Sequence, residues 1–282
     1  MNEPRMTGAR RHLTTALLTL LSAALLSSCG ADMHATDGVA SAAVTLQATG
    51  VPKSVVSALG APTAVAASPA GMQLGNGISL TLLRLGIERL GLRPVDESEA
   101  MAELDMNHVA DLMADGHRMG SILVPSGRSY QLDVEMGPVP GTEPQDPGAA
   151  WSMVLELAYV EPATGYAHTF RLRSDAPVAL HMTGPSGLMM GGGAHELILA
   201  WELEGLPLAP YAQGSILDAL LATPMDAGGV HALDAADYPD LFAAILEAMH
   251  QSMVFGEDMN HDGHLHDGDD HMIGHHGDGS MM

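Results

Sequence analysis

The sequence contains little cysteine and few basic residues, and each shortage excludes something. Cys29 is the single cysteine among 282 residues, so no disulfide can form within the chain. Lysine and arginine together number 11 against 34 aspartates and glutamates, which gives a net charge of −23 at pH 7. Such a charge repels phosphate groups. Nucleic acid is therefore not expected as a partner, and cations are the natural counterparts.

The motifs of common enzyme classes are also absent from the sequence. There is no Gly-x-Ser-x-Gly elbow, no His-Glu-x-x-His helix, and no cysteine besides Cys29 for nucleophilic or zinc-thiolate chemistry. The glycine-rich segment GLMMGGGAHE (187–196) lacks the Lys-Ser/Thr that a phosphate-binding loop requires. Because nothing supports catalysis, we expect a protein that is not an enzyme.

The N-terminus resembles a bacterial lipoprotein signal. Arginines precede an apolar run, residues 13–26, that is too short to span a bilayer as a permanent helix. The run ends in LSSC (26–29), and in such signals the cysteine receives a diacylglyceryl group and becomes the mature N-terminus. We therefore expect lipidation at Cys29 and export to the cell envelope, where the lipid would anchor the protein to a membrane. Gly30, where an aspartate would favour retention, indicates the outer membrane if the host is Gram-negative.

The rest of the chain divides by composition. Residues 29–75 are mostly Ala, Ser, Thr, Gly, Val and Pro and suit a tether, although Val44 to Gln47 could form a strand. From Ile78 to Leu208, apolar residues recur at every second position, which indicates strands. The Gly- and Pro-rich segments between them are too short for crossover helices, so antiparallel pairing is expected. About seven strands predict an antiparallel β-sandwich domain over residues 76–256.

One helix is predicted at the end of this domain, over about 238–253. Asp237 is the expected N-cap, and Pro239 lies in the first turn. The apolar residues that follow have the spacing of three and four that places them on one helix face: Leu241, Phe242, Ile245, Leu246, Met249 and Met253. Shorter helices are expected near 97–106 and 213–222.

The order of these features resembles a group of uncharacterised bacterial lipoproteins with a transthyretin-like or carboxypeptidase-regulatory-like β-sandwich. The resemblance covers roughly residues 76 to 260 and implies a fold and an envelope location, but no reaction. The matching segments are ISLTLLRLGIERLGL (78–92), HVADLMADG (108–116), ILVPSGRSYQLDVEMG (122–137), HELILAWELEGL (195–206) and DAADYPDLFAAILEAMHQSMVFGED (234–258).

The last 26 residues carry most of the candidate site chemistry. They hold seven carboxylates, six histidines, four methionines and no lysine or arginine. The segment DMNHDGHLHDGD (258–269) has oxygen ligands at positions one, three and five, glycine at six, an apolar residue at eight and a carboxylate at twelve. This spacing matches the EF-hand calcium loop, in which alternate side chains converge on one ion.

Two departures separate this segment from a complete EF-hand. Residues after Asp270 have no apolar helical repeat, so the second helix is missing. Asp269 stands where Glu usually provides bidentate ligation, which lowers the calcium affinity or shifts preference toward a smaller ion. The sequence therefore predicts half of an EF-hand.

The same segment supports a second interpretation, because imidazoles bind zinc, nickel or copper and thioethers suit Cu(I). A third interpretation is a disordered, acidic tail that only keeps the protein soluble. The predicted metal ligands, for a Ca²⁺ ion or a transition metal, are Asp258, Asn260, Asp262, His264, His266, Asp269, His271, His275 and His276.

Methionines and histidines outside the tail have a simpler explanation. Met101, Met106, Met113 and Met119 lie near His108 and His117 in the sequence and would suit copper, but methionine is also an adaptable core residue in a chain with three phenylalanines. We expect these methionines to fill the core. His181 and His195 flank a glycine-rich loop and could face one another across a hairpin, although His195 has the spacing of a residue at the rim of the core.

The leading hypothesis is a non-enzymatic, lipid-anchored envelope protein whose β-sandwich carries a C-terminal segment that binds a divalent metal ion. Its role would be cation binding, storage or sensing at the cell surface. The alternative is a β-sandwich that recognises a polymer or a protein, with an acidic tail that serves only as a solvated brush.

Overall fold

The computed structural model describes residues 38–49, 71–96, 101–113, 117–182, 187–265 and 270–275. For residues 271–275 only the backbone is described. Contacts divide the chain into two units, Met1–Thr36 and Asp37–Met282, and all described residues belong to the second. Cys29 and the signal peptide lie outside the described residues. None of the helices described is both long enough and apolar enough to cross a membrane.

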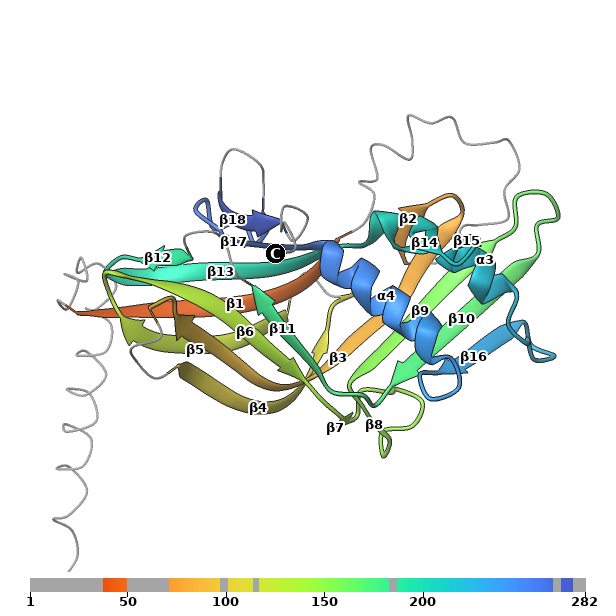
Figure 1. Cartoon of the computed structure of the whole chain (residues 1–282), viewed down its shortest axis with the longest axis horizontal. Coiled ribbons are helices and arrows are strands. Elements are labelled where there is room, and N and C mark those ends of the chain that lie inside the picture. Colours follow the sequence, from red (N-terminus) through yellow and green to blue (C-terminus); the bar gives the residue numbers. More distant parts are fainter. Residues whose placement is uncertain are drawn as a thin grey trace, which may run out of the picture. The chain divides into compact units, whose positions relative to one another are not determined.

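The described part of the chain is mainly β and forms two large sheets and two small hairpins (Figure 1). Sheet A contains, in spatial order, β18 (His271–His275), β17 (Met253–Glu257), β13 (Gly193–Glu202), β1 (Val39–Thr49) and β5 (His117–Pro125). Sheet B runs in the order β11 (Val178–Met182), β6 (Arg128–Met136), β3 (Ile78–Pro94), β9 (Met153–Val160), β10 (Ala167–Ser174) and β16 (Val230–Asp234). Beside this path, β2 (Met72–Gly75) and β4 (Ala102–Asp111) pair with β3, and β12 (Leu188–Met190) pairs with β6. The hairpins are β7 (Val139–Pro140) with β8 (Ala150–Trp151) and β14 (Pro210–Tyr211) with β15 (Gly214–Ser215).

Strand β3, the 17-residue strand predicted from its alternating leucines, organises sheet B. Arg84 pairs with Asp111 of β4 and with Val154 of β9, so these two strands lie on opposite edges of β3. Strand β6 pairs with residues 87–94, beyond the end of β9 and on the same edge. Because β3 spans both neighbours, it joins the β9–β10–β16 part of the sheet to the β4–β6 part, as Figure 1 shows.

Gly86 lies at the junction where β9 and β6 meet on β3. Its N–H donates to the carbonyl of Ser152 at 2.9 Å, and its carbonyl accepts the N–H of Gly137 at 3.0 Å. A Cβ atom at this position would lie 2.4 Å from the Gly137 oxygen and 2.7 Å from the Trp151 oxygen. Both contacts are with backbone, so the junction requires glycine.

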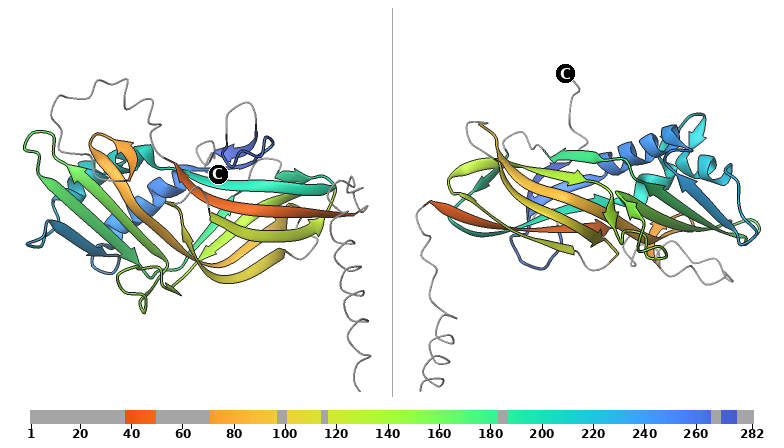
Figure 2. Two further views of the ribbon diagram at one scale, coloured as in Figure 1. Left: turned by 180° about the vertical axis from the view of Figure 1, so that it is seen from behind. Right: turned by 90° about the horizontal axis from the view of Figure 1, so that it is seen from below.

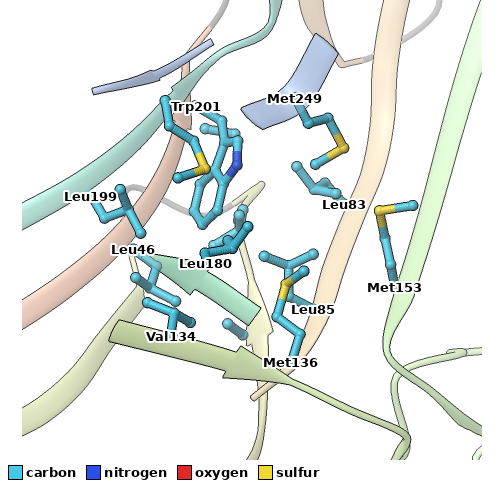
Figure 3. Packing of buried hydrophobic residues seen from close by; sticks show 14 of the residues in the cluster. Leu46, Leu83, Leu85, Val134, Met136, Met153, Leu180, Leu199, Trp201 and Met249 are labelled. Carbon is cyan, nitrogen blue, oxygen red and sulfur yellow. The ribbon is translucent and has the colours of Figure 1, made fainter. Parts of the chain in front are cut away.

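One apolar core connects the two sheets (Figure 3). Trp201 lies in it with 1% of its surface exposed. Methionine supplies much of the filling, as the shortage of phenylalanine predicts. The residues labelled in Figure 3 come from sheet A (Leu46, Leu199, Trp201), from sheet B (Leu83, Leu85, Val134, Met136, Met153, Leu180) and from the C-terminal helix (Met249).

The helix α4 (Pro239–Gln251) confirms the predicted amphipathic helix. Leu241, Phe242, Ile245 and Met249 on one face are buried. The N-cap is Tyr238 and not Asp237, and it makes no side-chain capping bond. The short helix α3 (Ile216–Leu221), which begins with a capping box between Ser215 and Asp218, confirms the helix expected near 213–222, and a 3-10 helix, η1 (Leu203–Leu208), follows β13.

The predicted tether extends too far along the chain, because β1 belongs to the folded domain. This strand lies between β13 and β5, as Figure 2 shows from behind. Ala40, Ala42, Val44 and Leu46 are buried in the core. Small alanine side chains give a weak hydrophobic signal, so only the Val44–Gln47 part was expected as a strand. The domain therefore begins before residue 76.

Two strand pairs contradict the prediction that all pairing is antiparallel. Strand β1 pairs in parallel with β13, and β10 pairs in parallel with β16. Neither pair is consecutive in the chain, so other strands and helices form the connection and no dedicated crossover helix is needed. The helix expected near 97–106 is also wrong over residues 102–106, which begin β4 and pair with β3.

A substitution at Gly86 tests the junction on β3. We expect Gly86→Ala to lower the free energy of unfolding by about 1–3 kcal/mol, because the new methyl group overlaps two backbone oxygens. The matched control is Gly205→Ala, where an added Cβ meets no atom within 4 Å. Urea unfolding of both variants measures the difference. Equal stability of the two variants would contradict the assigned role of Gly86.

Candidate functional site

The predicted metal-binding segment begins at the end of β17, on the outer part of sheet A. Strand β17 pairs with β13 on one side and with β18 on the other (Figure 1). Met253 and Phe255 bury their side chains in the core, which anchors the strand. One interpretation of the tail was a disordered segment, but its described part forms a loop, 258–265, and then β18, whose backbone is described. Asp258 is the first loop residue, and its N–H donates to the carbonyl of Glu196 at 2.9 Å.

Asp258 organises the loop from a buried position. Only 1% of the surface of Asp258 is exposed. Its two carboxylate oxygens accept the backbone N–H groups of His261 at 2.7 Å and Gly263 at 2.8 Å. These two residues have positive φ angles, 59° at His261 and 84° at Gly263. The chain therefore curls around the Asp258 carboxylate, and Gly263 permits the turn.

The next two oxygen ligands of the predicted set repeat this pattern. Asn260 Oδ1 accepts the N–H of Asp262 at 2.9 Å, and Asp262 Oδ1 accepts the N–H of His264 at 2.9 Å. The side chains at positions one, three and five thus each bind a backbone N–H further along the loop: Asn260 and Asp262 form Asx turns, and Asp258 binds the N–H groups three and five residues on.

The structure describes only part of the predicted ligand set. Within the described residues, no three side chains of His, Cys, Asp or Glu are grouped so that they could hold a metal ion. An EF-hand loop also uses an amide oxygen, a main-chain carbonyl and the carboxylate at position twelve. The amide of Asn260 is described, but Asp269 at position twelve lies outside the described residues. The predicted ligands His266 and His276 also lie outside them. His271 and His275 are described only as backbone of β18.

Side chains of sheet A that the sequence did not predict surround the base of the loop. His195 Nδ1 lies 2.6 Å from Glu257 Oε1, and both side chains are mostly buried. His261 Nδ1 lies 3.1 Å from Glu196 Oε2. At the far end of the loop, Asp270 Oδ1 accepts the N–H of Met259 at 2.9 Å. The sequence signal for this cluster is weak, since Glu257 ends β17 but Glu196 lies within β13, and their proximity depends on strand pairing.

His181 and His195 do not face one another as the hairpin hypothesis predicted. His181 lies on β11 in sheet B, where its Nδ1 is 2.8 Å from Asp133 Oδ1. His195 lies on β13 in sheet A. Strand β12, between them in the chain, pairs with β6, so the two segments do not form a hairpin. His195 is instead part of the cluster at the base of the loop.

Positive charge is absent from the second part of the chain. No lysine or arginine follows Arg173, although 17 of the 34 carboxylates do. The arginines of sheet B are already paired, Arg84 with Asp111 and Arg171 with Glu156, for example. The carboxylates near the loop therefore have only histidines or dissolved cations to balance them.

A second candidate site is a groove of about 730 Å³ beside α3. It is lined by the β14–β15 hairpin, by α3 and by the first turn of α4. Tyr211 and Tyr238 supply aromatic surface, and Asp218, Asp237 and Asp240 supply carboxylates. Asp218 is engaged in the capping box with Ser215, whose hydrogen bonds lower the pKa of this carboxyl group. The groove offers aromatic and acidic contacts and no basic ones.

A pair of histidines lies in sheet B, away from the loop. His168 Nδ1 is 3.2 Å from His231 Nε2, and His231 Nδ1 is 3.1 Å from the carbonyl oxygen of Thr223. His231 is 2% exposed, and its burial lowers its pKa. A hydrogen-bond chain from His168 through His231 to Thr223 satisfies the buried ring, so this pair has a structural role.

Comparison with known proteins assigns no family to the chain. No protein-family model, no curated protein and no solved structure matches it.

Burial of His231 predicts a dependence of stability on pH. Its lowered pKa means that the unfolded chain binds a proton more readily than the folded chain. Stability should therefore fall as the pH drops below about 6.5 and continue to fall through the lowered folded pKa. In His231→Gln, the slope of unfolding free energy against pH between 7 and 5 should be smaller than in the natural chain. His264→Gln, which removes an exposed imidazole, is the control, and an equal effect there would contradict this origin.

Proposed function

We propose that this protein binds one divalent cation, with Ca²⁺ as the first choice, in the loop from Asp258 to Asp269. The observation that supports the proposal is the set of side-chain oxygens of Asp258, Asn260 and Asp262 that each accept a backbone N–H of the loop around Gly263. A loop that only solvates the protein has no need to repeat this arrangement at positions one, three and five. Its role is cation binding, storage or sensing, without catalysis.

Electrostatics favours the same function. Half of the acidic groups follow Arg173 and no lysine or arginine does, although Arg173 itself pairs with Asp234. Four carboxylates make contacts at the loop or its base: Glu257 with His195, Glu196 with His261, Asp270 with the N–H of Met259, and Asp258 with the N–H groups of His261 and Gly263. Negative charges on one short segment repel one another. A bound divalent ion relieves that repulsion.

Transition-metal binding is the second candidate for the same segment. His264, His266, His271, His275 and His276 supply imidazoles, which suit zinc, nickel or copper. The contacts of the described residues favour oxygen ligation, because His261 is directed to Glu196 whereas the side-chain oxygens of Asn260 and Asp262 follow the loop.

The location and fold type complete the proposal. We infer that the two sheets form the layers of a β-sandwich of transthyretin-like or immunoglobulin-like type, as the resemblance to envelope lipoproteins implies. Lipidation at Cys29 would hold this domain on the cell envelope, in the outer membrane if the host is Gram-negative. The alternative, recognition of a polymer or a protein, draws support from the groove with Tyr211 and Tyr238.

Titration of the full chain with Ca²⁺ tests the proposal. We expect one saturable Ca²⁺ site by isothermal titration calorimetry, and Asp262→Asn should weaken it by about tenfold or more. The matched control is Glu204→Gln, which removes one exposed negative charge from η1, outside the loop. An absence of saturable binding, or an equal loss in the control, would leave only a solvated acidic loop.

A histidine variant separates calcium from transition metals. The triple change His266→Gln, His271→Gln, His276→Gln leaves Asp258, Asn260 and Asp262 in place. We expect it to retain Ca²⁺ binding and to lose most of any Zn²⁺ binding, both measured by equilibrium dialysis. Loss of Ca²⁺ with the imidazoles would show that the ligand assignment is wrong.

A further inference from the structure

Two histidines from different sheets meet at β4 and β5, far from the C-terminal loop in sequence. His108 lies on β4 in sheet B, and His117 is the first residue of β5 in sheet A. Their Nε2 atoms are 2.7 Å apart, and their ring centroids are 4.8 Å apart. Strands β4 and β5 contact one another and run side by side in Figure 1.

The backbone explains how the two rings meet. The pairing of β4 with β3 is irregular between Ile87 and Arg89, opposite the segment that contains Asn107 with a φ of 46°. This bulge changes the direction of the side chain that follows, His108. His117 has the same parity as the buried Met119, so it points to the side of β5 that faces the core.

The neighbouring methionines are engaged elsewhere, as expected from the sequence. Met106 and Met113 are partly buried and pack against the apolar core, and Met119 is 7% exposed within it. The sulfur atoms thus serve the core. The histidines, in contrast, meet where His108 is exposed to solvent.

The distance between the nitrogens fits a shared metal ion as well as a hydrogen bond between the rings. Two imidazole nitrogens, each about 2.0 Å from one metal ion, are about 2.8 Å apart at a right angle and about 3.3 Å apart at a tetrahedral angle. The observed 2.7 Å corresponds to the right angle. Adjacent ligands at right angles are typical of the tetragonal sites of Cu²⁺ and Ni²⁺, and among divalent ions Cu²⁺ binds nitrogen ligands most tightly.

We propose that His108 and His117 bind one Cu²⁺ or Ni²⁺ ion through their Nε2 atoms. No third His, Cys, Asp or Glu side chain in the described residues completes a metal group with them, so water fills the remaining positions. The ion would be exchangeable and would tie β4 of sheet B to β5 of sheet A. This site is independent of the proposed calcium loop.

The surroundings of the pair favour a cation. His117 is partly buried, whereas His108 beside it is exposed to solvent. The Asp111 carboxylate interacts electrostatically with His117 and would attract a cation. It remains bound to Arg84 at 2.9 Å and to the N–H of Met113 at 3.1 Å, so its position is fixed.

A hydrogen bond between the two rings is the competing explanation. One Nε2–H would then donate to the other ring, as His168 does to His231. In that second pair, however, the chain continues to the Thr223 carbonyl and the inner ring is buried. A hydrogen bond at an exposed ring exchanges with water and contributes little.

The test compares the amount of Cu²⁺ bound by variants of the full chain. Sites in the C-terminal segment contribute equally to every variant, so a difference between variants reports the site at His108 and His117. Equilibrium dialysis against Cu²⁺, followed by metal analysis, should show one equivalent fewer in His108→Gln and in His117→Gln than in the natural chain. His168→Gln, which breaks the other histidine pair, should lose none. Electron paramagnetic resonance of the bound Cu²⁺ should lose one two-nitrogen component in the first two variants only.

Thermal unfolding provides a second measurement that does not depend on counting sites. Cu²⁺ should raise the unfolding midpoint of the natural chain more than that of His108→Gln, which changes an exposed residue and leaves the core intact. Equal Cu²⁺ content, equal spectra and equal midpoint shifts in all chains would show an inter-ring hydrogen bond only. A matching loss in His168→Gln would show non-specific uptake, and either result would overturn the proposal.

Discussion

Backbone pairing along β3 is the constraint on which the rest of this structure depends. Four strands pair with its two edges, and two of them meet at Gly86, where there is no room for a side chain. The same strand supplies leucines to the core that sheets A and B share. Because β4 is held on β3 while β5 is held on β1, the chain must pass from one sheet to the other between them. That passage brings His108 to His117.

Charge is unevenly distributed along the chain, because every lysine and arginine lies in its first 173 residues. The arginines of β3 and β10 are paired with carboxylates of sheet B. Such pairs at partly exposed positions add little stability, but they leave few arginine side chains available to carboxylates of the acidic second half. The proposed cation loop lies where this imbalance is largest, and it is attached to sheet A through β17. Binding there would involve oxygen ligands, whereas the proposed site at His108 and His117 uses nitrogen, so the two sites would select different ions.

Much of the local structure could be predicted from the residues. The alternation between Ile78 and Leu208 predicted strands, among which the structure contains β3, β6, β9 and β10, and the three-and-four spacing after Pro239 predicted α4. The loop pattern at Asp258, Asn260 and Asp262 was also evident, because each of these side chains bonds to the backbone only a few positions away. Strand β1 was missed over most of its length because alanine carries little hydrophobic signal.

The sequence by itself determined the elements whose cause is local: the alternating strands, the amphipathic helix and the turns of the acidic loop. The tertiary structure alone decided which strands are neighbours, since pairing between β1 and β13 or β10 and β16 joins segments far apart in the chain. It therefore also decided that Glu196 and His195 lie at the base of the loop and that His108 meets His117. No pattern of spacing contains these contacts, because they arise only when strands far apart in the chain pair or when the two sheets pack against one core.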